Sequence, residues 1–104
     1  MTRQEFEHYQ AILFSKCADI ATAKGNEYSG LEDAHMNFKR LGHKLGLPPE
    51  KVLMVYLTKH MDSIDSFIRS GLDSSHLTEP IEGRIIDAIT YLSLLAALIE
   101  TGED

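Results

Sequence analysis

The chain contains a single cysteine, Cys17, no tryptophan and only three prolines among its 104 residues. One cysteine excludes a disulfide within the chain and every zinc site that is built from cysteine pairs. Such sparse cysteine usage is typical of the reducing cytoplasm, so we expect a cytoplasmic protein. Cys17 itself falls in an apolar helical stripe, where a free cysteine more often packs than reacts.

Positive charge is scarce as well. Ten Lys and Arg stand against sixteen Asp and Glu, which gives a formal net charge of −6. Because non-specific affinity for nucleic acid comes mainly from Lys and Arg on phosphates, this balance excludes a general nucleic-acid binder. A local basic pocket that holds one small anion is still compatible with it.

Long hydrophobic runs and the common catalytic motifs are also missing. The most apolar stretch, Ile85–Ile99, is too short to span a bilayer and is interrupted by Asp87. The first residues, MTRQEFEH, are polar and acidic, unlike a signal peptide. The chain has no P-loop, no GxGxxG and no HExxH. We therefore expect a soluble protein with no membrane partner.

Apolar residues recur at steps of three and four, which predicts a single all-α domain over residues 1–104. Clusters of glycine and proline at 25–30, 46–49 and 71–80 divide the chain. The prediction is a four-helix-bundle-like fold with helices at about residues 3–24, 32–45, 49–70 and 80–101.

Short local signals predict where these helices begin and end. Thr2 is placed to cap the first helix, with Glu5 completing a capping box. Gly25 is placed to end that helix, and Gly46 to end the second. The third helix begins at Pro49, where the missing N–H of proline costs nothing.

The helix over residues 80–101 is apolar or small on two faces. The first face is an unbroken seam that we expect to meet the core: Ile81, Ile85, Ala88, Leu92, Leu95 and Ile99. The second face carries small and apolar residues: Gly83, Ile86, Thr90, Ser93, Leu94 and Ala97. Since a chain this short has little material to cover both, the second face predicts a homo-oligomer. A central position of this helix in the monomer would also explain the second face.

The predicted core comprises Phe6, Leu13, Ile20, Phe38, Leu41, Leu53, Leu57, Ile64, Phe67, Ile85, Leu92 and Leu95.

Three polar clusters are candidates for a binding site. The first is the bend Lys24-Gly25-Asn26-Glu27-Tyr28, followed by Asp33 and Asn37. Its lysine supplies charge for a phosphate, its asparagine a two-way hydrogen bond and its tyrosine a stacking face. An ordinary loop between helices would have a similar composition.

The other two clusters lie on the third and fourth predicted helices. The second cluster consists of Tyr56, Lys59, His60 and Ser63, which share one side of a helix. The third consists of Glu79, Glu82, Arg84, Asp87 and Tyr91. Lysine resists burial without a partner, and an arginine beside an apolar seam favours a bidentate anion. A structural histidine and an Arg84–Asp87 ion pair would explain the same residues.

Four acidic residues are candidate ligands for Mg²⁺, which prefers oxygen. Asp62 and Asp65 are three residues apart, and Glu82 and Asp87 are five apart. A solvated acidic face would have the same spacing.

Four segments together resemble a known group of proteins: KGNEYSG, the Asn37-Phe38 pair, VYLTKHMDSI and EPIEGRIIDAITYLSLLAALIE. They resemble short helical proteins of bacteriophages and prophages, which are similar to the nucleotide-modification-associated domain family. More distantly, they are similar to the MazG-like all-α nucleotide pyrophosphatases. The resemblance covers residues 24–100 and implies a nucleotide-type ligand.

The MazG-like resemblance also implies helical oligomers in which acidic pairs, ExxE and ExxD, hold Mg²⁺. Asp62 and Asp65 correspond to the first pair, and Asp87 corresponds to the final acid. Arg84 stands where the remaining acid would be, so the set of four is incomplete.

We therefore expect a phage-type, oligomeric helical protein that binds a nucleotide or nucleotide-derived small molecule. By analogy, it would sequester a nucleotide signal of host immunity in the cytoplasm of a bacterial host. The predicted ligand site consists of Lys24, Asn26, Glu27, Tyr28, Lys59, His60, Arg84, Asp87 and Tyr91. Two alternatives stay open: a Mg²⁺-dependent nucleotide pyrophosphatase that uses the four acids, and a protein-interaction module that uses the last helix.

Overall fold

The computed structural model describes residues 1–28, 33–75 and 77–102, with the backbone alone at 24–28. It contains four helices: α1 (Arg3–Tyr28), α2 (Met36–Leu45), α3 (Pro49–Arg69) and α4 (Ile81–Thr101). Within these residues there is no strand, and the predicted all-α fold is confirmed. No helix in this part of the chain has the length and apolar character needed to cross a membrane.

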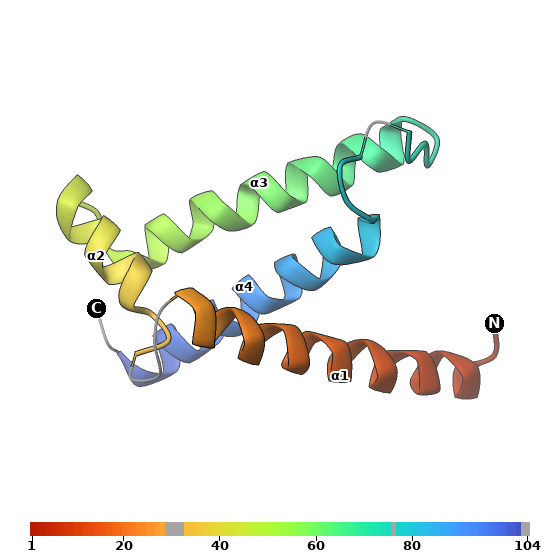
Figure 1. Ribbon diagram of the computed structural model, residues 1–104, viewed down its shortest axis with the longest axis horizontal. Helices are drawn as coiled ribbons and strands as arrows, with labels where there is room; N and C mark the ends of the chain where they lie inside the picture. Colours follow the sequence, from red (N-terminus) through yellow and green to blue (C-terminus); the bar gives the residue numbers. More distant parts are fainter. Residues whose placement is uncertain (29–32, 76, 103–104) are drawn as a thin grey trace.

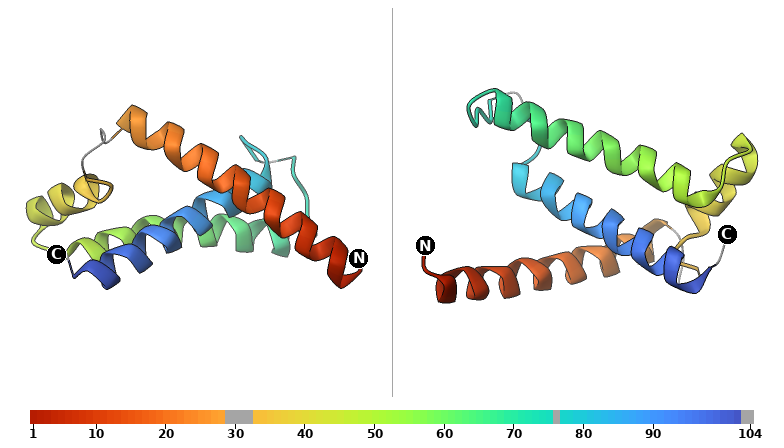
Figure 2. Two further views of the ribbon diagram at one scale, coloured as in Figure 1. Left: turned by 90° about the horizontal axis from the view of Figure 1, so that it is seen from below. Right: turned by 180° about the vertical axis from the view of Figure 1, so that it is seen from behind.

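α4 lies between two other helices. α3 and α4 run antiparallel and side by side, and α2 packs at the first turns of α3 (Figure 1). α1 crosses the opposite side of α4, as both views in Figure 2 also show. α1 therefore packs on α4 and not on α2 or α3 in the described part of the chain.

The beginning of α1 follows the prediction, whereas its end does not. The Thr2 Oγ1 accepts the backbone N–H of Glu5 at 3.1 Å, as a capping threonine does. The helical backbone continues through Gly25 to Tyr28, so the predicted end at residue 24 is wrong. A glycine inside a helix costs only about 1 kcal/mol relative to alanine, which by itself does not end a helix.

α2 begins at Met36, later than predicted. Residues 29–32 are outside the described part of the chain, and the backbone from Asp33 to His35 is a turn. The Asp33 Oδ1 accepts the backbone N–H of His35 at 2.8 Å. This local bond competes with the helical pattern, which explains the later start.

The end of α2 and the start of α3 are as predicted. Gly46 has a φ of 70°, and its N–H points to the carbonyl of His43 at 3.4 Å. The Leu47 N–H donates to the Gly42 carbonyl at 2.8 Å, which completes a Schellman motif. Pro49 is the first residue of α3, and α4 ends before Gly102, which has a φ of 65°.

The best-packed core lies where α2, α3 and α4 meet. Leu53 is wholly buried there, next to buried Phe38 and Val52. Five other apolar side chains are also buried: Cys17, Leu57, Ile86, Ala88 and Leu98. Burial raises the pKa of the Cys17 thiol, as expected of a packing cysteine.

Two predictions about packing are wrong, one on the core and one on the intermolecular face of α4. Three residues predicted for the core, Phe6, Ile85 and Leu92, are exposed by 45%, 37% and 51%. Ile86, which we expected on the intermolecular face, is only 2% exposed, and Leu94 packs against the core. A helix that is apolar nearly all round does not show from its own pattern which side its neighbours cover. α1 and α3 cover much of the predicted second face of α4 and leave part of the predicted seam uncovered.

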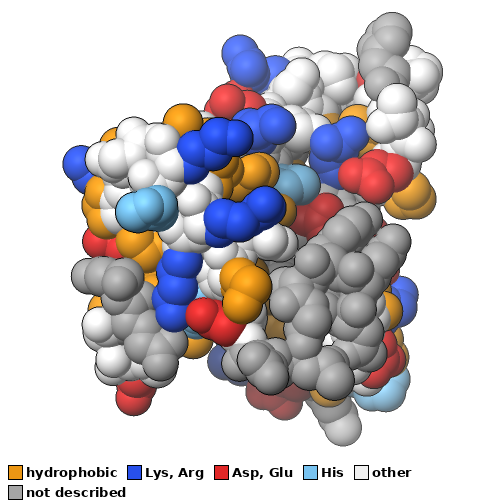
Figure 3. All heavy atoms as spheres, turned by 60° about the vertical axis from the view of Figure 1, so that its left-hand side comes forward, with side chains coloured by type: hydrophobic (Ala, Val, Ile, Leu, Met, Phe, Trp, Pro, Cys, Tyr) orange, Lys and Arg blue, Asp and Glu red, His pale blue; other side chains and the backbone are white. Residues whose placement is uncertain are grey.

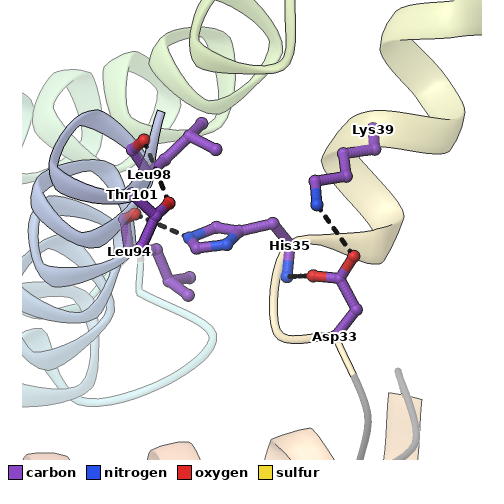
Figure 4. A network of polar contacts seen from close by, with 6 residues as sticks. All are labelled: Asp33, His35, Lys39, Leu94, Leu98 and Thr101. Atoms are coloured by element: carbon purple, nitrogen blue, oxygen red, sulfur yellow. Dashed lines mark hydrogen bonds and ion pairs between the residues drawn. The ribbon is translucent and has the colours of Figure 1, made fainter. Parts of the chain in front are cut away.

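His35 anchors the turn before α2 to α4 (Figure 4). This side chain is 6% exposed, and its Nε2 lies 2.8 Å from the Leu94 carbonyl. Because a carbonyl only accepts, the Nε2 carries the proton. Asp33 links the same turn to α2, because its Oδ2 accepts a hydrogen bond from the Lys39 Nζ at 2.9 Å.

This turn predicts a pH-dependent stability. The hydrogen bond from Lys39, and then that from the His35 N–H, hold the pKa of Asp33 below the 3.8 of an ordinary aspartate. A carboxyl with a lowered folded pKa stabilises the protein above its unfolded pKa, and this contribution is lost as the pH falls through the folded pKa. Asp33→Asn should therefore be less stable than the wild type at pH 6, with the gap closing below 3.8. Urea unfolding across this range measures the gap. The exposed Asp62→Asn serves as control, and a gap that does not depend on pH would contradict the assignment.

Candidate functional site

A pocket opens between α2, α3 and α4. Its volume of about 530 Å³ falls within the range of roughly 300–1,000 Å³ that is usual for small-molecule sites. Five lining residues come from α2 and one each from α3 and α4: Asn37, Phe38, Arg40, Leu41, Lys44, Tyr56 and Tyr91. The pocket therefore exists only because three helices meet.

Three aromatic rings form one wall of this pocket. Tyr56 and Tyr91 stack with their ring centroids 6.1 Å apart and their planes at 10°. Phe38 meets both rings edge-on, at 5.8 Å from Tyr56 and 6.2 Å from Tyr91. Tyr56 and Tyr91 are half-buried, so the pocket presents aromatic surface at its boundary with solvent.

Cations line the α2 side of the pocket. α2 carries Lys39, Arg40 and Lys44 but no acidic residue, although the chain as a whole is acidic. Figure 3 shows Lys and Arg side chains gathered among hydrophobic ones on this side of the molecule. Lys44 lies in the last turn, where the helix dipole favours a cation. Arg40 lies one turn earlier, and two like charges four residues apart on a helix repel each other. An anion between them would relieve that repulsion.

The aromatic wall continues to His60. The His60 ring stacks on Tyr91 with centroids 5.1 Å apart, and its Nδ1 lies 3.9 Å from the Asp87 Oδ2. Both side chains of this pair are about one-fifth exposed, at 21% and 18%. The His60 Nδ1 is a buried atom that makes no hydrogen bond to another described residue. Tyr91 thus joins the pocket to a second polar group, which consists of His60 and Asp87.

Arg84 lies one helical turn before Asp87 on α4. Its Nε is 3.9 Å from the Glu79 Oε1, and its Nη2 donates to the Thr78 Oγ1 at 3.5 Å. Within the described part of the chain this Nε is buried without a hydrogen bond, so the guanidinium retains a donor.

The structure brings together part of the predicted ligand site. His60, Asp87 and Tyr91 are neighbours, with Arg84 one turn away. Lys59 is exposed. The side chains of Lys24, Asn26, Glu27 and Tyr28 are outside the described part of the chain.

The four acids proposed for Mg²⁺ come from two helices, Asp62 and Asp65 from α3 and Glu82 and Asp87 from α4. Asp65 pairs with Arg69 at 2.9 Å, and Glu82 pairs with Lys16 at 3.0 Å. Asp62 is exposed. It follows His60 by two residues, so the two side chains leave α3 on nearly opposite sides. Across residues 1–28, 33–75 and 77–102, no three His, Cys, Asp or Glu side chains gather as metal ligands.

The predicted site omitted the cations of the pocket, Arg40 and Lys44. The signal for them was a short segment with three cations and no acid in an acidic chain. The sequence does not reveal that these cations line one pocket with Tyr56 and Tyr91, because that depends on how three helices pack.

Comparison of the chain with protein-family models, with curated proteins and with solved structures finds no match.

Proposed function

We propose that the protein binds a nucleotide or nucleotide-derived small molecule in the pocket between α2, α3 and α4. The observation that carries this proposal is that the stacked rings of Tyr56 and Tyr91 line the same pocket as the cations Arg40 and Lys44. A nucleotide combines a flat aromatic base with an anionic phosphate, and this pocket offers a partner for each.

Each part of the ligand has a chemical counterpart in the pocket. The base stacks against a tyrosine ring, a contact worth about 1–3 kcal/mol per base where it has been measured. The Arg40 guanidinium binds two phosphate oxygens through its planar fork, and Lys44 adds a mobile point charge. The Asn37 amide both donates and accepts, so it suits the edge of a base.

The second polar group extends this site. His60 and Asp87 adjoin the pocket through Tyr91, and they would meet a ligand larger than a mononucleotide together with Arg84, one helical turn from Asp87. The predicted contributions of Lys59 and of the bend from Lys24 to Tyr28 belong to the same proposal. Because Arg84 stands where the MazG-like pattern has an acid, we favour binding without hydrolysis.

The biological setting is part of the proposal. We place the protein among phage-type helical proteins of the bacterial cytoplasm, where it would sequester a nucleotide signal of host immunity. Self-association through α4 also belongs here, since this helix exposes Leu92 and Ile99 by 51% and 69%. A soluble monomer rarely exposes a contiguous apolar patch larger than roughly a few hundred Å².

The proposed function is tested by measuring nucleotide binding before and after the charges of Arg40 and Lys44 are removed. A thermal-shift panel of mono-, di- and cyclic nucleotides should identify a binder, and calorimetry then gives its Kd. A ligand at 100 times its Kd should add about 2.7 kcal/mol of stability. Arg40→Gln and Lys44→Gln should each weaken binding about tenfold or more, because each removes a charge-assisted hydrogen bond to phosphate. Lys51→Gln, an exposed lysine of α3 outside the pocket, is the matched control and should bind as the wild type does.

Three outcomes would contradict this function in different ways. A panel without any shift would leave the protein-interaction module as the better hypothesis. Binding that survives both pocket variants but is lost in Arg84→Gln would move the site to Arg84 and the neighbouring second polar group. Mg²⁺-dependent release of phosphate or pyrophosphate that is lost in Asp87→Asn would identify a nucleotide hydrolase.

A further inference from the structure

The chain exposes more surface than a compact protein of its size. Its accessible surface is 7571 Å², whereas a compact monomer of 11.7 kDa has about 5,900 Å². The radius of gyration is 15.5 Å, against about 13 Å for a compact domain of this length. The excess of roughly 1,700 Å² is comparable to the area that one subunit loses in a stable dimer.

Part of the exposed surface is an apolar stripe on α4. Ile85, Leu92 and Ile99 follow at seven-residue intervals and are exposed by 37%, 51% and 69%. Half-buried Ile89 and exposed Ala96 lie between them, so the steps alternate between four and three residues. That alternation is the pattern of a seam that packs on another helix.

The first half of α1 is a second exposed apolar surface. Cys17 is buried and Lys16 pairs with Glu82 at 3.0 Å, so α1 meets α4 in its second half. Phe6 and Tyr9 continue the same stripe towards the amino terminus, where they are 45% and 47% exposed. There α1 diverges from the α3–α4 pair (Figures 1 and 2).

We propose that a second copy of this chain covers these two surfaces, in an interface built from Phe6 and Tyr9 of α1 and Ile85, Leu92 and Ile99 of α4. The excess surface of two such chains is about 3,400 Å², which falls within the roughly 2,000–5,000 Å² that obligate homodimers bury. Homodimer interfaces are also more apolar than the ordinary protein surface, as this stripe is. The inference rests on the self-association in the proposed function and not on the nucleotide.

α3 provides a matched comparison surface. Met54, Met61 and Ile68 also follow at seven-residue intervals and are exposed by 45%, 49% and 59%. The residues at the intervening seam positions are Thr58 and Asp65, and Asp65 pairs with Arg69. A polar residue interrupts this stripe at each step, so we expect it to face solvent.

The proposal is tested by measuring the mass in solution of four proteins, by size-exclusion chromatography with light scattering. The wild type should have at least twice the monomer mass of 11.7 kDa. Leu92→Glu and Phe6→Glu should each weaken association by about 30-fold or more, because each places a charge in the apolar centre of the interface. Met61→Glu matches Leu92→Glu in exposure, 49% against 51%, and should assemble as the wild type does. Helical circular dichroism should be unchanged in all four.

The possible failures are distinguishable. A monomeric wild type overturns both the interface and the self-association in the proposed function. This holds even if a different protein binds the apolar stripe of α4. A wild-type oligomer that persists in Leu92→Glu and Phe6→Glu, or that dissociates in Met61→Glu, overturns the interface alone. Nucleotide binding, measured separately with Arg40→Gln, is not affected by either result.

Discussion

Leu53→Ala is expected to lower the free energy of unfolding by about 2–5 kcal/mol. Leu53 is 0% exposed at the point where α3 packs against both α2 and α4. The shorter side chain leaves a cavity beside Phe38 and Val52, and the neighbouring helices close it only in part. Because small domains are stable by only about 5–15 kcal/mol, this single change removes a large share of the total.

The neighbouring residue is a control for Leu53→Ala. Met54 is 45% exposed, so Met54→Ala removes a side chain that still contacts water in the folded protein. Its effect should be below about 1 kcal/mol, as for most surface substitutions. Urea unfolding followed by circular dichroism compares the two variants. Equal losses would show that the core is not centred where these three helices meet.

Gly42→Ala is expected to destabilise the protein by about 1–3 kcal/mol, although alanine is the better helix former. A Cβ at this position would lie 2.5 Å from the Leu47 carbonyl oxygen, where the chain turns back over the last turn of α2. The obstacle is a backbone atom held by the Schellman motif, because the Leu47 N–H is bonded to the Gly42 carbonyl at 2.8 Å. The clash therefore has no flexible side chain that could move aside.

Gly83→Ala is the matched control, since Gly83 also lies within a helix. A Cβ there would meet nothing within 4 Å in the single chain. This variant should be more stable than the wild type by about 0.5–1 kcal/mol, because alanine loses less backbone freedom on folding. Thermal unfolding should thus shift in opposite directions for the two variants. Stabilisation by both would contradict the close approach at Gly42.

Gly42→Ala also has a consequence for the pocket. The turn from α2 to α3 sets the angle at which α2 meets α3, and α2 carries both Arg40 and Lys44. If this turn opens, the cations move relative to Tyr56 and Tyr91. We therefore expect weaker nucleotide binding by the folded fraction of Gly42→Ala, while Gly83→Ala should bind as the wild type does.

The sequence by itself determined the fold class and most helix ends. Thr2, Gly46, Pro49 and Gly102 act on backbone groups within a few residues, so their effect is readable without the rest of the chain. Gly25 is the exception, because the helix continues through it although it is a glycine like Gly46. α2 ends at Gly46 because the backbone there has a left-handed φ and the chain turns back, and these are properties of the conformation rather than of glycine alone.

Only the tertiary structure decided which face of α4 is inside and what lines the pocket. Ile85 and Ile86 are adjacent and chemically identical, yet they are 37% and 2% exposed. The difference comes from where α1 and α3 happen to cover a helix that is apolar nearly all round. In the same way, Arg40, Tyr56 and Tyr91 share a pocket because α2, α3 and α4 converge. Contacts between residues far apart in the chain depend on the packing of whole helices, which the spacing along any single helix does not record.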